Sequence, residues 1–225
     1  MDRKPSSAGP VAPSLISTFL SLEGALYAMF LVLDLMGQGG QSIPIKYGGI
    51  LLCLAFSLLC AQKGGDRLVP PALALTACAD WFLLVRGDHY ALGIVLFLGV
   101  QTVYLLRLRR AGAGSAYPLR AALALGSGLA VYAAGLADPQ NLLAALYFSQ
   151  LLSNAVLAWG RRGERWLRFA LGLALFIGCD LCVGLFNVLP PSSPCYFAVS
   201  IGMWLFYLPS QVLIALSALP EKEAS

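Results

Sequence analysis

Long apolar stretches separated by short polar segments make up most of this chain. An α-helix needs about 20 residues to cross a hydrocarbon core of ~30 Å, and eight stretches approach that length. The stretches are residues 15–34, 45–61, 68–86, 90–108, 118–137, 141–159, 167–189 and 196–219. The pattern therefore predicts an all-α fold, a polytopic membrane protein with eight transmembrane helices.

Composition supports this class. Of the 225 residues, 59% are hydrophobic and only 12% are charged, and the mean hydropathy is +0.76. A soluble domain needs a more polar surface than this composition supplies. We expect a single transmembrane domain at residues 15–219 between short cytoplasmic tails, an N-terminal tail at 1–14 and a C-terminal tail at 220–225.

The basic residues predict how the helices are oriented. With eight spans, Lys46 and Arg86 are the two Lys or Arg on one face of the membrane, and the other 13 of the 15 lie on the face that holds both termini. Those residues are Arg3, Lys4, Lys63, Arg67, Arg107, Arg109, Arg110, Arg120, Arg161, Arg162, Arg165, Arg168 and Lys222. Because basic loops stay in the cytoplasm, both termini are expected there. The net charge of +4 then reflects topology and anionic headgroups, and we expect no nucleic-acid partner.

Two carboxylates lie deep inside predicted helices, Asp80 and Asp180. An intramembrane carboxylate costs roughly 2.5–3.5 kcal/mol on insertion scales, so it usually marks a functional site. By helical rise the two lie about 9 and 15 Å below the outer helix ends. They can form a general acid/base pair, one protonated and one ionised, or they can only hold helices together through hydrogen bonds. Their similar depth favours function.

A basic, glycine-rich stretch at 109–117 divides the chain into halves, 15–110 and 117–219. The third and seventh predicted helices each carry one of the aspartates, and the fourth and eighth each carry a glutamine near a tyrosine. These glutamines and tyrosines are Gln101, Tyr104, Tyr207 and Gln211. The spacing is that of two parallel four-helix repeats with a site at their interface, although eight apolar helices also produce such coincidences by chance.

Other polar residues add weaker candidates. Glu23 is a third intramembrane carboxyl, which either completes the site or belongs to a loosely inserted amphipathic helix. Lys46 suits a lipid phosphate as a point charge, or it snorkels to the interface. Cys179 and Cys182 have CxxC spacing, but within a helix, and His89 is the single histidine. We therefore expect no metal site and no cofactor.

Four short stretches, in this order and spacing, resemble the YhhN-like lysoplasmalogenase family, whose eight-span members occur in bacteria and in animal endoplasmic reticulum. The stretches are Lys46 at the start of the second helix, Asp80-Trp-Phe-Leu-Leu with residues 90–97 and Gln101-Thr-Val-Tyr104, Phe176-Ile-Gly-Cys-Asp180, and residues 207–219 beginning Tyr207-Leu-Pro-Ser-Gln211. Three positions depart from the family pattern. Ala79 and Cys179 replace Gly and Ser before the aspartates, and Gln101 replaces a histidine.

The resemblance implies hydrolysis of the vinyl ether bond of a lysoplasmalogen to a fatty aldehyde and a glycerophospho-base. It casts Asp80 and Asp180 as the catalytic acid and base, with no metal or cofactor. The expected partners are a lysophospholipid and the bilayer, while a homo-oligomer stays open. We expect the location to be the bacterial cytoplasmic membrane. The expected substrate-binding residues are Glu23, Lys46, Gln101, Tyr104, Tyr207 and Gln211.

Two rival interpretations stay open at this point. Intramembrane aspartates and parallel repeats are equally typical of a small transporter in which Asp80 and Asp180 bind a proton or cation. Gln101 favours a third interpretation, a non-catalytic lipid-binding protein, because glutamine cannot carry a proton at physiological pH.

Overall fold

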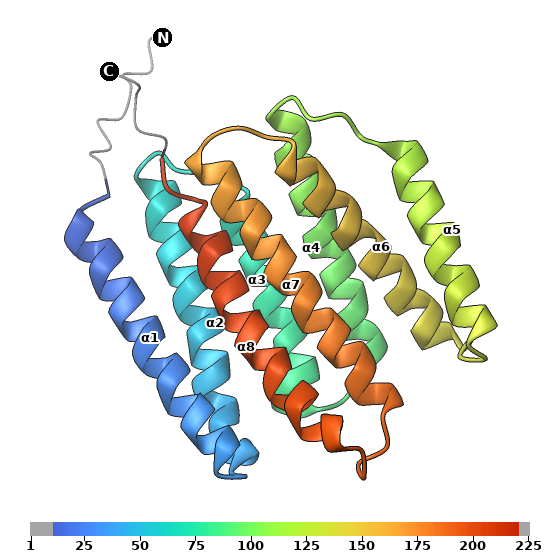
Figure 1. Ribbon diagram of the computed structural model, residues 1–225. Coiled ribbons are helices and arrows are strands. Elements are labelled where there is room, and N and C mark those ends of the chain that lie inside the picture. The colour runs from blue at the N-terminus through green and yellow to red at the C-terminus, as the bar shows by residue number, and fades with distance from the viewer. Residues whose placement is uncertain (1–10, 221–225) are drawn as a thin grey trace.

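The described residues form eight long helices that run up and down in turn, and each helix packs against the next one along the chain, except for the α4–α5 pair (Figure 1). The computed structural model describes residues 11–220, and every regular element within that range is helical. The elements are α1 (Pro13–Leu35), α2 (Gly39–Gln62), α3 (Val69–Asp80) with its π-helical continuation η1 (Trp81–Arg86), α4 (Tyr90–Arg110), α5 (Tyr117–Ala133), α6 (Pro139–Trp159), α7 (Glu164–Val188) and α8 (Pro194–Leu216). The predicted tails, with Arg3, Lys4 and Lys222, lie largely outside the described residues.

The helices begin where the sequence supplies start signals. Proline occupies the first turn of α1, α3, α5, α6 and α8, where its missing N–H would be unpaired in any case. Asp138 caps α6 by accepting hydrogen bonds from the backbone N–H groups of Gln140 and Asn141. These signals specify where the helices begin.

Helix α8 lies at the centre of the bundle and packs against α1, α2, α3 and α7. Its closest neighbour is α7, because Gly172 has no side chain there. A Cβ at Gly172 would lie 2.8 Å from Cγ1 of Ile214 and 3.1 Å from the carbonyl oxygen of Ser210. Small residues permit this kind of close helix contact in membranes. This contact holds α7 beside α8, and α3 packs against α8 separately.

Helix α5 lies at one edge of the bundle and, among the described helices, packs only against α6 (Figure 1). We predicted a span at 118–137, but the helix ends at Ala133, just before Gly135, whose φ of 72° is left-handed. Its 17 residues reach about 25 Å at 1.5 Å per residue. The other seven helices are long and apolar enough to cross a membrane, so the chain is an integral membrane protein.

The predicted helix at 68–86 is not uniform. It is α-helical to Asp80 and π-helical from Trp81 to Arg86, and it stops at Gly87, whose φ of 64° is left-handed. A π-helix widens the turn and often occurs at functional sites. Here it begins at the residue after a candidate catalytic aspartate.

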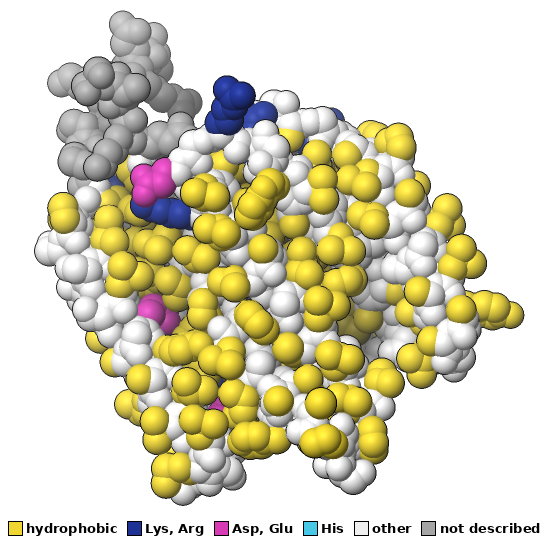
Figure 2. All heavy atoms as spheres, in the orientation of Figure 1, with side chains coloured by type: hydrophobic (Ala, Val, Ile, Leu, Met, Phe, Trp, Pro, Cys, Tyr) yellow, Lys and Arg dark blue, Asp and Glu magenta, His cyan; other side chains and the backbone are white. Residues whose placement is uncertain are grey.

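Hydrophobic side chains are spread over the face of the bundle seen in Figure 2, and Lys and Arg side chains gather near the end that holds the α2–α3 and α6–α7 connections. Asp66, in the α2–α3 connection, organises this basic end. Its Oδ2 accepts a hydrogen bond from Nε of Arg107 at 2.7 Å and one from Arg165 at 2.5 Å. Arg107 also donates to the hydroxyl and carbonyl oxygens of Ser217. The cluster ties the ends of α4, α7 and α8 together.

The pKa of Asp66 reflects this surrounding. Burial alone would raise the pKa, but attraction to Arg107, the hydrogen bonds from the Leu68 N–H and from Arg107, and attraction to Arg165 outweigh it and hold the pKa below its ordinary value of 3.8. The ionised carboxylate therefore stabilises the fold above about pH 4, and that stabilisation is lost as the pH falls through the lower pKa of the folded state.

We expect Asp66→Asn to destabilise the protein by about 3 kcal/mol, because it leaves buried Arg107 without its counter-charge. Thermal unfolding in detergent at pH 7 measures the loss, which should shrink below pH 4. The control is Asp88→Asn, since Asp88 pairs with Arg86 on the surface and its loss should change little. Equal effects of the two substitutions would contradict this role for Asp66.

Candidate active site

Asp80 is the last residue of α3 and is 5% exposed. Its Oδ2 accepts a hydrogen bond of 2.7 Å from the hydroxyl of Tyr207 on α8. A buried carboxyl needs such a partner, because an unsatisfied polar group in an apolar surrounding is costly. The structure thus joins Asp80 to Tyr207, a residue that the sequence also placed among the candidates.

Asp180 lies on α7 and is partly exposed. Its Oδ2 accepts a hydrogen bond of 2.7 Å from the hydroxyl of Tyr147, which is buried on α6. Each aspartate is therefore held by one phenol from another helix. The sequence analysis missed Tyr147. A signal was present, because Tyr147, Gln150 and Asn154 are spaced to lie on one face of α6 and form a polar stripe in an apolar helix.

Aromatic rings connect the two aspartate–tyrosine pairs. The ring of Phe176, one turn before Asp180 on α7, has its centroid 5.4 Å from that of Tyr207 and 6.5 Å from that of Tyr147. Phe97 on α4 packs at 5.6 Å against both Tyr147 and Phe176. One aromatic cluster thus contains both phenols that bond the carboxyls, and its rings fill the space between them.

The two pairs do not repeat one another. If the halves of the chain were equivalent, Asp180 on α7 would be expected to meet a tyrosine on α4, as Asp80 on α3 meets one on α8. Its partner instead comes from α6, and Tyr104 of α4 packs edge-on against Phe169, with the ring centroids 5.1 Å apart. The parallel-repeat arrangement stays a prediction.

Lys46 is buried, and its ammonium lies 2.7 Å from Oδ2 of Asp34. Ser42 donates a hydrogen bond of 2.6 Å to the other oxygen of Asp34. The ammonium lies 4.8 Å from the ring centroid of Trp204, and that ring packs edge-on against Tyr207. Lys46 therefore forms a buried ion pair with Asp34, and this pair lies beside Trp204 at the edge of the aromatic cluster. The sequence analysis missed Asp34.

Glu23 is 3% exposed at the interface of α1 with α2. Its Oε1 accepts a hydrogen bond from Sγ of Cys53 at 3.3 Å, and its Oε2 has no partner among the described residues. A Cβ at Gly49 would lie 3.2 Å from that Oε2, so the missing side chain makes room for the carboxyl. Burial between helices favours a membrane helix over a loosely inserted one. None of these contacts joins Glu23 to Asp80 or Asp180.

Gln101 lies in a separate buried network. Nδ2 of Asn154 donates to the side-chain and backbone oxygens of Gln101, both at 2.9 Å. Oδ1 of Asn154 accepts from Arg120 at 2.6 Å, and Arg120 also donates to Gln150 at 2.7 Å. This network links α4 to α6 and α6 to α5. Gln101 is therefore engaged in helix packing.

The remaining candidates are buried near these clusters. Tyr104 and Gln211 are both 0% exposed. Within the described residues, the hydroxyl of Tyr104, Oε1 of Gln211 and Nε2 of Gln101 have no hydrogen-bond partner. Gln211 lies one turn after Tyr207 on α8.

Comparison with known proteins identifies one family. A family model described as the YhhN family matches residues 41–218, which is most of the chain. The match includes Lys46, Asp80, Tyr147, Asp180 and Tyr207, and it excludes Glu23 and Asp34 on α1. No curated protein sequence and no solved structure matches the chain.

We expect Tyr207→Phe to destabilise the fold by about 1–3 kcal/mol, because the ring stays while Asp80 loses its buried hydrogen bond. The control is Tyr196→Phe, because Tyr196 stacks on Phe186 and its hydroxyl bonds no described residue. Thermal unfolding in detergent compares the two. A loss no larger than that of the control would show that the Tyr207 hydroxyl does not support Asp80.

Proposed function

The chain belongs to the YhhN family, and from this premise we propose that it is a membrane-embedded hydrolase of the lysoplasmalogenase type. The observation that carries the proposal is the pair of intramembrane carboxyls, Asp80 and Asp180, each held by one tyrosine in a shared aromatic cluster. The proposed reaction takes lysoplasmalogen and water to a fatty aldehyde and a glycerophospho-base.

Vinyl ether hydrolysis needs proton transfer at two points. A carboxylic acid delivers a proton to the alkene carbon that is β to the ether oxygen, which gives an oxocarbenium ion. A carboxylate offsets the developing positive charge and removes a proton from the water that adds to the cationic carbon. The hemiacetal then collapses: its hydroxyl group gives a proton to the carboxylate that had served as the acid, the carbon–oxygen bond to glycerol breaks, and the glycerol oxygen takes the proton held by the base.

We assign the acid to Asp80 and the base to Asp180. Asp80 is the more deeply buried of the two, and burial away from water favours an uncharged acid. Asp180 is partly exposed, so we place the attacking water on its side. The tyrosine hydroxyls stabilise whichever carboxyl is ionised, because they donate hydrogen bonds to it. Tyr147 and Tyr207 are thus positioning residues in this scheme.

The aromatic cluster and the adjoining Trp204 match the apolar chain and the charged phosphate of the substrate. The rings of Phe97, Phe176 and Trp204 offer an apolar surface to the alkenyl chain once the buried rings of Phe97 and Phe176 move aside. The chain then stays in an apolar phase when it moves from bilayer to protein. Lys46 lies beside Trp204 and offers a positive charge to the lipid phosphate, with Asp34 holding the ammonium in place. The unpartnered groups of Gln101, Tyr104 and Gln211 are donors or acceptors for the glycerol and headgroup oxygens.

We also propose the finer topology. All eight helices cross the membrane, α5 included, and both termini face the cytoplasm. Support comes from the basic residues near the α2–α3 and α6–α7 connections and from the alternation of successive helices (Figure 1). The bundle forms one domain over residues 15–219, and halves at 15–110 and 117–219 stay part of the proposal.

One observation favours a second candidate. Gln101 cannot transfer a proton, and its side chain accepts a hydrogen bond from Asn154. If the family histidine is needed for proton transfer, this chain is a non-catalytic lipid-binding member. A transporter that uses the same carboxyls is a further alternative, and the activity test below distinguishes both from the hydrolase.

We expect Asp80→Asn and Asp180→Asn each to reduce aldehyde release from lysoplasmalogen by about 100-fold or more, because asparagine keeps the shape but transfers no proton. The two groups act in one reaction, so the double substitution should be little worse than either single one. The control is Asp88→Asn, at the exposed ion pair with Arg86, which should keep full activity. Gas chromatography of the aldehyde measures the rate.

Folded wild-type protein that releases no aldehyde from choline or ethanolamine lysoplasmalogen would exclude the hydrolase, provided that Gln101→His is equally inactive. Activity gained only with Gln101→His would assign the wild-type chain to the lipid-binding alternative. A carrier predicts no aldehyde from any variant, with the aspartates affecting uptake alone.

The topology has its own test. Cys195 is exposed at the start of α8, and a cysteine at Gly114 would lie in the α4–α5 connection. In intact cells, a membrane-impermeant maleimide should label Cys195 of the wild-type chain, whereas Gly114→Cys combined with Cys195→Ser should react only after permeabilisation. Cys195→Ser is the control for background labelling. The reverse pattern would invert the orientation, and labelling of both from outside would contradict eight spans.

A further inference from the structure

A cleft of about 480 Å³ opens at the basic end of the bundle. It lies between the α2–α3 connection, the end of α4 and the start of α7. The charged and aromatic residues that line it are Asp66, Arg67, Arg107, Arg110, Arg161, Arg165 and Trp166. Along α7, Arg165 is 15 residues from Asp180, which is about 22 Å by helical rise. The cleft is therefore separate from the proposed catalytic site.

The cleft has more positive charge than the fold uses. Five arginines face the single carboxylate of Asp66, which pairs with Arg107 and Arg165. Arg67 and Arg110 are exposed and bond no described side chain or backbone group. In addition, Nε of Arg161 and Nε of Arg165 are enclosed without a hydrogen-bond partner among the described residues. A multiply charged anion with several acceptor oxygens would offset this excess charge and accept hydrogen bonds from the exposed Arg67 and Arg110.

The guanidinium groups are held in place before any ligand arrives. The guanidinium carbons of Arg107, Arg161 and Arg165 lie 5.0, 5.8 and 5.2 Å, respectively, from the ring centroid of Trp166. Arg161 also donates to the carbonyl oxygen of Ala111. Planar guanidiniums in fixed positions suit a phosphate, which they bind through paired hydrogen bonds.

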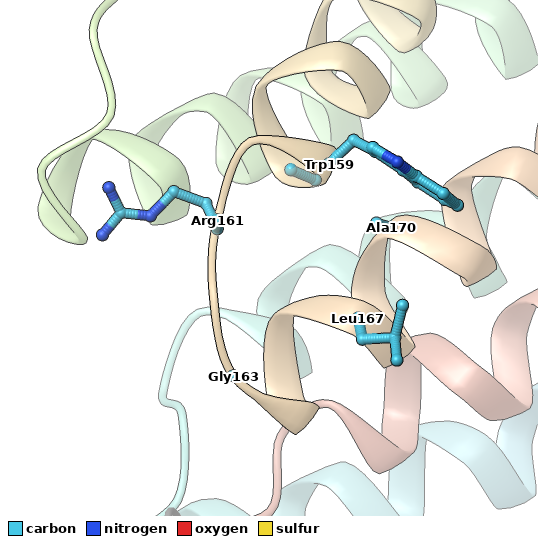
Figure 3. A pocket seen from close by; sticks show the side chains of 6 residues that line it. Trp159, Arg161, Gly163, Leu167 and Ala170 are labelled. Carbon is cyan, nitrogen blue, oxygen red and sulfur yellow. The ribbon is translucent and has the colours of Figure 1, made fainter.

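A second cavity of about 280 Å³ shares Arg161 with this cleft. Its other lining is apolar, with Trp159, Leu167 and Ala170 on the α6 and α7 sides (Figure 3). Figure 3 shows the guanidinium of Arg161 turned away from Trp159 and Leu167. A basic cleft and an apolar cavity thus meet at one arginine, which is the arrangement that a phosphate joined to an acyl chain requires.

We infer that this surface binds an anionic phospholipid, with the phosphate in the arginine cleft and the start of an acyl chain in the apolar cavity. The shared chemistry is that of a phosphate anion. The adjoining apolar cavity and the location at the end of membrane-spanning helices select the lipid over free phosphate as its source.

The test uses full-length protein in a zwitterionic detergent and short-chain phosphatidic acid as the probe. Saturable binding, followed by native mass spectrometry and by thermal stabilisation, is the expected result. The double substitution Arg67→Gln/Arg110→Gln should weaken binding roughly tenfold or more, since basic residues near anionic lipid each contribute about 1 kcal/mol. These arginines bond no described group, so the variant should fold normally.

The matched control is Arg109→Gln/Arg162→Gln, which removes two exposed arginines that do not line the cleft and should leave binding unchanged. An equal loss of lipid binding in this control would mean that binding depends on the general charge of the surface, and it would overturn the proposed site. Equal stabilisation by short-chain phosphatidylcholine would overturn selectivity for an anion. Equal stabilisation by inorganic phosphate at the same concentration would show that free phosphate is sufficient, and it would overturn the proposal that the ligand is a lipid. The test measures lipid binding and not vinyl ether hydrolysis, so its outcome does not depend on whether the proposed activity is correct.

Discussion

The need to satisfy carboxyl groups inside the bilayer shapes the rest of this structure. Asp34, Asp80, Asp180 and Glu23 all lie within or at the ends of apolar helices, and each finds a partner on another element. Lipid offers no hydrogen bonds, so each pairing specifies which helices meet. The contacts of Asp80 and Asp180 join α3 to α8 and α7 to α6. The carboxyl groups proposed to act in the reaction therefore also specify which helices pack together.

This double role has a mechanistic consequence. A tyrosine hydroxyl that stabilises a resting carboxyl must share that carboxyl with substrate or water during a reaction. The rings of Phe97 and Phe176 close the space between the two aspartate–tyrosine pairs. An alkenyl chain can therefore enter this space only if these rings move. The π-helix η1 begins directly after Asp80 and is the place where α3 departs from regular geometry. We expect access to the site to involve this end of the bundle.

Much of the fold was accessible from sequence, because crossing a bilayer imposes a length and a hydropathy on each helix. Asp80, Asp180 and Tyr207 stood out because polar groups are rare in apolar stretches. Tyr147 did not, since a tyrosine in a membrane helix usually packs through its ring, and its hydroxyl partner is 33 residues away. Asp34 was missed because it lies at a helix end, and only the α1–α2 turn brings Lys46 to it. The shortness of α5 and the π-helical turn depend on local geometry that hydropathy does not encode.

The most direct test of the central claim, carboxyl-mediated proton transfer to a vinyl ether, is hydrolysis of lysoplasmalogen in D₂O with mass spectrometry of the aldehyde as it is trapped. Protonation of the alkene carbon predicts one deuterium on the carbon next to the aldehyde, together with slower turnover than in H₂O. In H₂¹⁸O, the label should enter the aldehyde and not the glycerol. An aldehyde without deuterium at that carbon, or no aldehyde from folded protein, would contradict the account.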